Sequence, residues 1–463
     1  MMFLKLRVYT SFFFLLFLMG TQTSCKKYLQ IPGPSDQLNT NVVFASDATA
    51  TEAVLGIYHE MMNSQNQFTN GFTTLYAGLY ADELHYYTPG ARDEFEADQI
   101  TIRNHGVISA GLWVPAYKYI YTANVCIQGL TSARALSPAV KNQLLGECYF
   151  IRSFCFFYLV NFFGDVPLTI STDYKVNEVL DRTPASRVLE QVVSDLQNAA
   201  SLLPAEYPTM EKTRPNKWAA VALLSRVHLY LEKWAEASQE ATQVIESGNY
   251  HLESDLNQVF LQNSSEAIWQ LQPVFPGYNT YEGYNLLPAS STETPKYLVT
   301  SELLNAFETG DNRKTNWVGV RTYNGQTLYY PMKYKVYGKN APVSEYYTMI
   351  RLAELYLIRA EAWAHQNNLP EATNDLNVIR NRSGLSNTAA QSQTEILEAI
   401  EQERRVELFS EWGHRWLDLK RTGRADAVLG SLKPATWHAT DSLWPIPIDQ
   451  LNANPRLKQN PGY

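Results

Sequence analysis

The sequence has few of the residues that metal sites and nucleic-acid-binding surfaces require. It contains 4 cysteines and 8 histidines in 463 residues, and the cysteine spacings match no metal-binding motif. Its 38 basic residues are outnumbered by 46 acidic ones, giving a net charge of -8, and they form no basic stripe. No serine or cysteine nucleophile motif is present. We therefore expect no metal site, no cofactor and no nucleic-acid partner.

The sequence also lacks an apolar run long enough to cross a membrane, which requires about 18 residues. The apolar run of residues 11–19 follows Lys5 and Arg7 and precedes a stretch of small residues that ends at Cys25. This order is typical of a secretory signal, here residues 1–24. Cleavage before Cys25 would free a cysteine that can carry several acyl chains, as in bacterial lipoproteins. Gln22 stands where lipoproteins usually have leucine, so a plain secretory signal is the alternative.

Three further cysteines, Cys126, Cys148 and Cys155, cannot all pair with one another because their number is odd. Cys148 and Cys155 are seven residues apart in an apolar stretch with helical spacing. Free cysteine is among the residues most often buried in protein cores. We therefore expect buried thiols.

Apolar residues recur at helical spacing along much of the chain, which predicts a mainly α fold. Small residues alternate with bulky ones in two segments of about 34 residues each, as in tetratricopeptide repeats, where small side chains let antiparallel helices approach closely. The predicted helices are 48–62, with Asp47 as the capping residue; one from about 112; 138–163, ending at Gly164; 186–203; helix pairs in 216–246 and 349–382; and 392–412. These predict a tetratricopeptide-like superhelix of helix pairs.

Other parts of the chain show little helical periodicity. Residues 251–348 are rich in tyrosine, glycine and asparagine and predict loops and short strands packed against the helices. Residues 71–111 also look irregular, and the proline-rich tail should lie extended over the surface. The expected organisation is a lipidated tether over 25–46, an N-terminal helical region over 47–250, the irregular section over 251–348 and a C-terminal region over 349–463. Residues 47–463 are expected to form one compact body.

Several motifs together resemble the SusD/RagB family of outer-membrane nutrient-binding lipoproteins. They are residues 25–32 (CKKYLQIP), 150–168, 351–362 (RLAELYLIRAEA), 403–409 with 413–423 (GHRWLDLKRTG), 444–447 (WPIP) and 454–463. This resemblance implies four tetratricopeptide-like helix pairs, an outer-membrane location with the lipid-anchored protein facing the cell surface, and a SusC-like TonB-dependent transporter as partner. It also implies that the protein captures an oligosaccharide or a peptide without cleaving it.

A sugar ring has an apolar face and a rim of hydroxyls, so it is bound by exposed aromatic rings beside planar polar groups. We expect two or three of the aromatic and polar residues outside the regular helices to contact the ligand, although a packing role is the alternative for each one. The candidates are Asp82, Glu83, Tyr86, Tyr87, Arg92, Tyr278, Tyr281, Tyr284, Asn285, Trp317, Arg321, Tyr323 and Asn324.

Charged residues within the apolar helical stripes predict an internal ion network, since a buried charge must be paired. Its predicted members are Arg152, Glu354, Glu361, Glu403, Arg404, Glu407, Arg415, Asp418 and Arg421. His414 is expected to make a structural hydrogen bond.

The leading hypothesis is a glycan-capturing lipoprotein. A peptide-binding protein of the RagB type is the alternative, and a glycoside hydrolase with two carboxylates across a cleft is a third hypothesis that no motif supports.

Overall fold

Helices make up most of the described chain, in keeping with the apolar periodicity of the sequence. The computed structural model describes residues 40–90, 92–338 and 341–463. Phe44–Tyr463 form one compact unit. The predicted signal peptide and the predicted lipidation site, Cys25, lie outside the described residues. Within the described ranges no helix is both long and apolar enough to cross a membrane.

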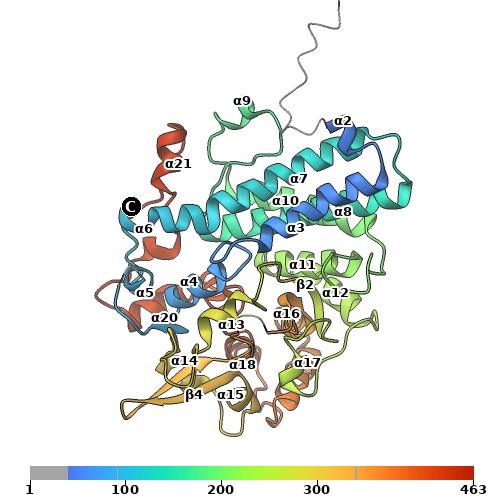
Figure 1. Ribbon diagram of the computed structural model, residues 1–463. Helices are drawn as coiled ribbons and strands as arrows, with labels where there is room; N and C mark the ends of the chain where they lie inside the picture. The colour runs from blue at the N-terminus through green and yellow to red at the C-terminus, as the bar shows by residue number, and fades with distance from the viewer. Residues whose placement is uncertain (1–39, 91, 339–340) are drawn as a thin grey trace, which may run out of the picture. The chain divides into compact units, whose positions relative to one another are not determined.

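The first layer of helices is built around α8 (Pro138–Phe163), whose side chains are buried along most of its length. It packs against α7 (Val114–Ser132), α10 (Ala185–Leu202) and α3 (Asp47–Met62), and these helices lie side by side across the upper part of Figure 1. The helix α8 ends as predicted at Gly164, whose φ of +71° is a left-handed conformation that glycine adopts without strain.

Two helix pairs continue the stack. The first consists of α11 (Lys217–Tyr230) and α12 (Trp234–Ile245), and the second of α16 (Leu352–His365) and α17 (Leu369–Arg382). The helix α12 packs against α16, and α18 (Gln393–Glu407) covers α16 and α17. Alanines at the contacts are fully buried, together with leucines and isoleucines: Ala353, Leu357, Ala360, Ala364, Ala372, Leu376, Ile379, Ile396 and Ile400. The predicted mainly α, tetratricopeptide-like fold is confirmed.

Three predicted details differ at the helix ends. The capping residue of α3 is Ser46, whose side chain accepts a hydrogen bond from the Thr49 backbone at 3.3 Å, whereas Asp47 is the first helical residue. The segment 349–382 begins with a strand because Arg351 and the residues before it pair with another strand. The helix α18 ends at Glu407, so the predicted helical position of Glu411 is wrong.

The prediction that residues 71–111 are irregular is wrong for much of the segment. It contains α4 (Phe72–Tyr80) and α6 (Ile102–Ile108), and α6 runs through a π-helical turn, Ser109–Trp113, into α7. All nine residues of α4 are buried. At nine residues, α4 is shorter than the window of about 11–18 residues over which helical periodicity is recognised, so no helical pattern stands out in its sequence.

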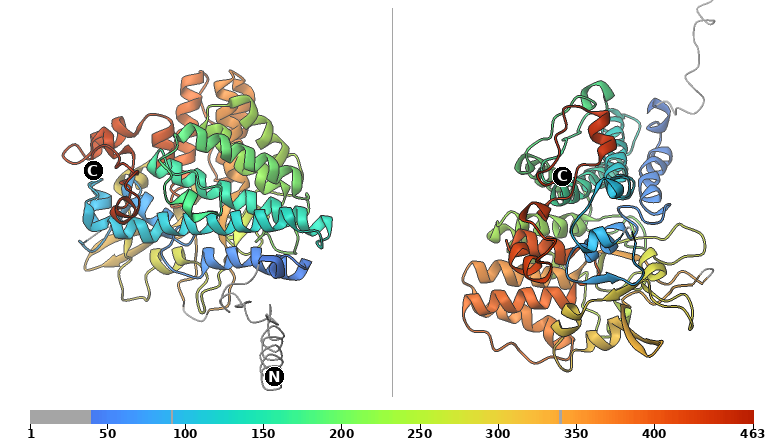
Figure 2. Two further views of the ribbon diagram at one scale, coloured as in Figure 1. Left: turned by 90° about the horizontal axis from the view of Figure 1, so that it is seen from above. Right: turned by 90° about the vertical axis from the view of Figure 1, so that its left-hand side faces the viewer.

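Short strands and helices fill the tyrosine-rich section. Three two-stranded antiparallel sheets are formed by β1 (Leu84–Tyr86) with β3 (Tyr297–Val299), β2 (Ala267–Leu271) with β6 (Tyr347–Arg351), and β4 (Val318–Tyr323) with β5 (Gln326–Pro331). The helices of this section are α13 (Tyr281–Leu286), α14 (Ser301–Ala306) and α15 (Asn312–Trp317). The right-hand view of Figure 2 shows the section, in yellow and gold, gathered on one side of the helical body.

The C-terminal part contains α19 (His414–Arg421), α20 (Ala425–Leu432) and α21 (Ile448–Ala453). The predicted extended tail is therefore partly helical. It is also partly buried, because Trp444 is inaccessible and its ring centroid lies 4.4 Å from that of Phe162. The remaining short helical segments are α2 (Thr40–Val43), α5 (Asp93–Glu96), α9 (Tyr174–Asn177) and 3-10 turns at Leu256–Gln258 and Ala439–Ser442.

Candidate functional site

Tyrosines from several separate segments gather on the side of the molecule that carries α13. We define the tyrosine face as Tyr86, Arg92, Tyr278, Tyr281, Tyr284, Lys296 and Tyr337. Lys296 is exposed and the other six side chains are half-buried, so each one presents part of its surface to solvent. In Figure 1, α13 lies on the side of the molecule turned toward the viewer.

The short helix α13 fixes two of these rings. Thr280 caps it, because its side-chain oxygen accepts a hydrogen bond from the Gly283 backbone at 3.1 Å. Glu282 and Gly283 are buried, whereas Tyr281 and Tyr284 are half-buried one turn apart. The ring of Tyr281 lies so close to Gly71 that a Cβ on that glycine would approach it to 2.3 Å. The helix therefore holds both rings on a rigid support.

Tyr284 is the centre of the ring contacts. Its ring centroid lies 5.2 Å from that of Tyr337, with nearly parallel planes, and 4.9 Å from that of Tyr278, edge to face. The ammonium group of Lys296 lies 4.9 Å from the Tyr284 ring centroid. Such contacts restrict each ring to one orientation. Stacking of a ligand on these rings therefore costs little side-chain entropy of the protein.

The first loop region adds a second group of rings. Strand pairing sets Tyr86 opposite Tyr297, with ring centroids 5.0 Å apart. The Arg92 guanidinium lies 4.4 Å from the centroid of the Tyr86 ring, a cation–π contact. Burial raises the pKa of Tyr281, and nearby Tyr76 adds to this increase while the charge of Arg92 opposes it. Tyr281, whose ring centroid lies 6.0 Å from that of Tyr284, is thus also near Arg92 of the second group.

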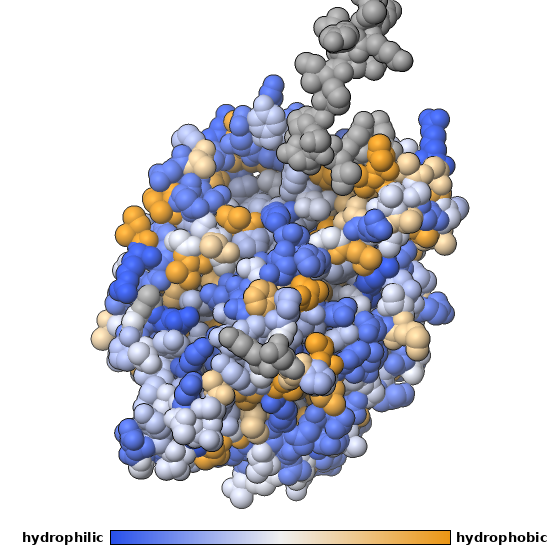
Figure 3. Space-filling model, viewed as in Figure 1, coloured by the Kyte–Doolittle hydropathy of each residue, from blue (hydrophilic) through white to orange (hydrophobic). Residues whose placement is uncertain are grey.

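The space-filling view shows this side of the molecule as small hydrophobic areas separated by hydrophilic ones (Figure 3). A tyrosine ring offers an apolar face and a hydroxyl at once. The tyrosine face can thus contact the carbon face of a sugar and hydrogen-bond its hydroxyl rim. The seven residues that define the tyrosine face include no carboxylate.

Three of the candidate ligand-contact residues are buried. Glu83, Asn285 and Trp317 are buried, with exposed fractions of 1%, 5% and 0%. The Trp317 indole N–H donates to the backbone oxygen of Leu256 at 3.0 Å. Glu83, Asn285 and Trp317 therefore have the packing role that was the alternative for each candidate.

The other predicted contacts lie outside the tyrosine face. Tyr87 is half-buried, and its backbone N–H donates to the Lys296 oxygen at 2.9 Å. Arg321 donates to the backbone oxygen of Ser290 at 2.8 Å. Tyr323 and Asn324 are at the turn of the β4–β5 hairpin, which lies below α13 in Figure 1.

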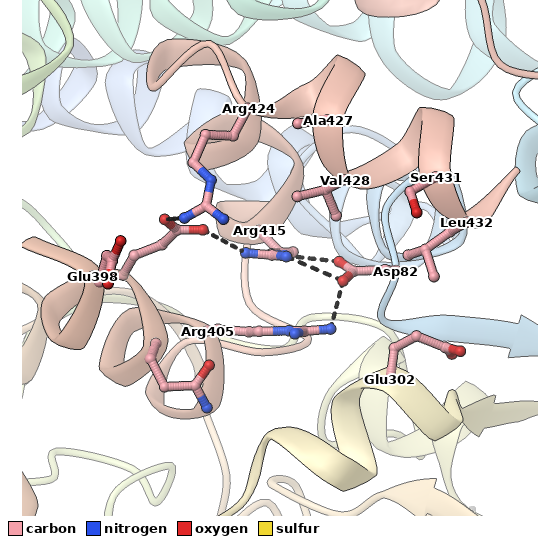
Figure 4. Close-up of a pocket in the computed structure, with 12 residues that line it drawn as sticks. Asp82, Glu302, Glu398, Arg405, Arg415, Arg424, Ala427, Val428, Ser431 and Leu432 are labelled. Carbon is pink, nitrogen blue, oxygen red and sulfur yellow. Dashed lines mark hydrogen bonds and ion pairs between the residues drawn. The ribbon is translucent and has the colours of Figure 1, made fainter. Parts of the chain in front are cut away.

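Asp82 lies in a charged cavity of about 560 Å³ rather than on the tyrosine face (Figure 4). Its carboxylate accepts hydrogen bonds from Arg415 Nε at 2.7 Å and from Arg405 Nη2 at 2.5 Å. Glu401 in turn pairs with Arg415 and Arg424. Burial raises the pKa of Asp82, but the two arginines lower it by a larger amount. The pKa of Asp82 therefore lies below its usual value of 3.8. A ligand would have to displace these ion pairs, so the tyrosine face is the stronger candidate site.

All nine residues of the predicted ion network lie in ion pairs. The pairs are Arg152 with Asp195, Glu354 with Arg226, Glu361 with Arg421, Glu403 with Arg313 and Arg380, Arg404 and Arg421 with Asp418, Arg415 with Asp82 and Glu401, and Glu407 with Arg313, Arg351 and Arg382. The pair of Arg152 joins α8 to α10 in the first helix layer, where it shares no member with the other pairs.

Glu407 is the centre of the largest cluster and is fully buried. It accepts from Arg351 at 2.6 Å and from Arg313 at 2.9 Å, and it also pairs with Arg382. These arginines lie on β6, α15 and α17, respectively. The cluster therefore fastens the tyrosine-rich section to the helical stack, and its role is structural.

The sequence predicts a structural hydrogen bond for His414. It is buried, but its Nδ1 has no hydrogen-bond partner among the described residues. Burial lowers its pKa to about 4, which keeps the ring neutral. Among the described residues, no group of three or more histidines, cysteines or carboxylates is arranged to hold a metal ion.

Sequence analysis missed Lys296 and Tyr337 as members of the site. Tyr337 belongs to the same tyrosine-rich section, so composition could have included it. No local signal marks Lys296, because its position over Tyr284 depends on the pairing of β3 with β1.

Comparison with known proteins places the chain in a family. A family profile described as "Starch-binding associating with outer membrane" matches residues 27–229, and the profile of the SusD family matches residues 273–463. SusD-like protein P25 of Formosa agariphila is 24% identical, over 96% of this chain and 98% of that protein. Starch-binding protein SusD of Bacteroides thetaiotaomicron is 23% identical, over 73% of this chain and 74% of that protein.

Solved structures agree with the fold. A SusD superfamily protein from Bacteroides vulgatus superposes with a TM-score of 0.78 at 21% identity, covering 91% of this chain and 100% of that one. A SusD homolog from Bacteroides thetaiotaomicron gives a TM-score of 0.79 at 18% identity, covering 92% of this chain and 98% of that one. The two family profiles together span most of the sequence, in chain order, and the chain therefore belongs to the SusD family.

Proposed function

We propose that this protein captures an oligosaccharide or polysaccharide at the outer membrane and passes it to a SusC-like TonB-dependent transporter. The observation that carries the proposal is the tyrosine face, where rings fixed by one another and by α13 present their surfaces to solvent. The family description names starch binding and association with the outer membrane, which supports the same role.

The shape of the tyrosine face favours an extended ligand. Its rings come from β1, from α13, from the loop before α13 and from the loop between β5 and β6, and each is partly exposed, so they form a surface rather than a closed pocket. Successive sugar units of a chain can each stack on a ring, and the phenol hydroxyls and Lys296 can bond the hydroxyl rim. Several weak contacts along one polymer then add up to useful affinity.

Binding can be tested with a matched pair of variants. Tyr284→Ala removes the central ring of the tyrosine face, whereas Tyr174→Ala removes a ring that is 66% exposed on α9, far along the chain from that face. We expect Tyr284→Ala to weaken binding of a retained glycan by about tenfold or more, since central aromatic anchors contribute about 2 kcal/mol. Tyr174→Ala should bind like the unchanged protein. Affinity electrophoresis on a polysaccharide panel, followed by calorimetry, measures both.

The same measurements separate the alternatives. Retention by no glycan, together with calorimetric binding of peptides that Tyr284→Ala weakens, would assign the face to peptide capture. Equal loss of affinity in both variants would mean that the tyrosine face is not the site.

The protein is proposed to hold its ligand without cleaving it. The seven residues that define the tyrosine face include no carboxylate, and the carboxylates of Glu407 and Asp82 are engaged with arginines. Incubation with each bound polysaccharide should release no reducing sugar. Release that persists in repurified protein would overturn this part of the proposal.

The lipid anchor is proposed from the signal-like start of the sequence and from Cys25. Mass spectrometry of the mature N-terminus should show an acylated cysteine, and Cys25→Ser should abolish the acylation and release the protein from membranes. Protease treatment of intact cells should degrade the anchored protein if it faces the surface. Co-purification from solubilised membranes should recover a large β-barrel transporter.

A further inference from the structure

The helices α7 and α8 form an antiparallel hairpin whose register can be read from pairs of facing residues. Arg152 donates to the Asn124 side chain at 2.7 Å, and the rings of Trp113 and Phe163 lie 4.9 Å apart. The Lys141 ammonium donates to the backbone oxygen of Ala133 at 3.0 Å. In each pair the two residue numbers sum to nearly the same value, as antiparallel pairing requires.

This register sets Cys126 opposite Cys148. Burial raises the pKa of Tyr119 and the nearby Cys155 thiol adds to this increase, so Tyr119 and Cys155 lie close together, as the register requires. Cys126 follows Tyr119 by seven residues, and Cys148 precedes Cys155 by seven residues. Seven residues are close to two helical turns, so both steps return to the same helix face. The Cys126 and Cys148 side chains therefore meet two turns from the first pair.

Both thiols are enclosed at this contact. Cys126 is 3% exposed and Cys148 is fully buried. The nearby Cys148 thiol lowers the pKa of Cys126, whereas burial raises the pKa of Cys148, so the two thiols lie close together. Cys155 is also buried, but it lies two turns farther along α8.

The distance between facing positions suits a covalent link. Packed helix axes lie about 8–10 Å apart, and each Cα lies about 2.3 Å from its own axis. Facing Cα atoms are then separated by roughly 3.4–5.4 Å, which overlaps the span of about 4.4–6.8 Å that a disulfide accepts. Both cysteines are free thiols in the structure, and a bridge would join them across this contact.

We propose that Cys126 and Cys148 form a disulfide when the chain folds in an oxidising compartment, and that Cys155 stays a thiol. The oxidant is a protein or small-molecule disulfide, attacked by one cysteine as its thiolate to give a mixed disulfide. The second cysteine then displaces it. Overall, two S–H bonds break, one S–S bond forms, and the oxidant's disulfide is reduced to two thiols that take up the two protons and two electrons.

Because both sulfurs are buried in the folded protein, the disulfide must form during folding. A large oxidant cannot reach them in the folded hairpin, so the bond forms before α8 is covered by its neighbours, and afterwards it resists reductants. The bond closes the turn between α7 and α8 and stabilises the hairpin chiefly by restricting the unfolded chain. It is independent of the proposed ligand.

Thiol mapping of the exported full-length protein tests the proposal directly. The protein is purified without reductant, denatured and blocked with N-ethylmaleimide, then reduced and labelled with iodoacetamide. Peptide mass spectrometry should find Cys126 and Cys148 carrying the second label and Cys155 the first. Three cysteines carrying only the first label, or a bridge that includes Cys155, would overturn the proposal.

Thermal melting gives a second test with a matched control. Wild-type protein folded under oxidising conditions should melt roughly 5 °C higher than the same protein folded with excess reductant. Cys155→Ser should keep that difference, and Cys126→Ser should lose it. Equal melting temperatures of the two wild-type preparations would contradict the proposed bond, whether or not the variants fold well.

Discussion

Glu282 on α13 is a buried acid, and its burial makes the stability of the protein depend on pH. Its side chain is inaccessible, and neither carboxylate oxygen has a hydrogen-bond partner among the described residues. Tyr347 and Thr74 are near enough to favour the ionised form slightly, but burial dominates and raises its pKa from 4.5 to about 7. We predict that Glu282→Gln, which removes the ionisable group and keeps the shape, stabilises the protein at high pH.

The sign and size follow from proton linkage. Below pH 4.5 the carboxyl is protonated in both the folded and the unfolded chain, and it imposes no penalty. Between pH 4.5 and about 7 only the folded chain keeps the proton, so stability falls as pH rises. The rise of the Glu282 pKa from 4.5 to about 7 corresponds to about 3 kcal/mol in the free energy of unfolding. This part of the stability is fully lost above pH 7. Glu282→Gln should therefore gain up to about 3 kcal/mol over wild type at pH 8 and little at pH 5.

The assay is the difference in melting temperature between variant and wild type across this pH range. Glu83 and Asp98 are also buried, with pKa values raised by burial to about 8, so wild-type stability alone would mix three acids. Subtracting the two curves isolates Glu282. Glu190→Gln, at a residue whose side chain is 62% exposed, is the control and should show no such trend. A difference between Glu282→Gln and wild type that stays constant from pH 5 to 8 would refute the reasoning.

Two further substitutions probe the scaffold. Glu407→Gln removes the carboxylate that three arginines share and should lower the free energy of unfolding by about 3–5 kcal/mol in urea titration, with Glu190→Gln again near zero. Burial raises the pKa of Glu407, but its arginine partners lower it well below 4.5, so this stabilisation is present above pH 4.5 and is lost as pH falls through the folded-state pKa. Gly111→Ala places a Cβ 2.1 Å from the ring of Phe72 and should lower stability by about 1–3 kcal/mol, whereas Gly106→Ala, with open space around it, should not.

Periodic helices were predictable because each has one apolar face. The pattern of α8 and its stop at Gly164, and the alternation of small and bulky residues in the helix pairs, are local properties that any packing of the chain must satisfy. The helix α4 was not predicted, because its nine residues are too few to show helical spacing. The charged residues that form buried ion pairs were also predictable, but their partners were not. Glu354, for example, pairs with Arg226, which is 128 positions away in the sequence.

The ligand surface depended on long-range contacts. Trp317 and Tyr284 stand in similar sequence surroundings, yet the first is sealed against Leu256 while the second lies on the tyrosine face. Whether an aromatic ring in an irregular segment is buried depends on which distant strand or loop covers it. The local sequence around the ring does not indicate this.

The sequence by itself determined the helical pairs, the signal-like start with Cys25 and the need to pair charges within apolar stripes, because these follow from local periodicity and from the high free energy of an unpaired buried charge. Only the tertiary structure decided which tyrosines reach solvent together and that Cys126 faces Cys148. Both depend on the pairing of segments across the fold, β1 with β3 and α7 with α8, and that pairing is selected by packing of the whole chain.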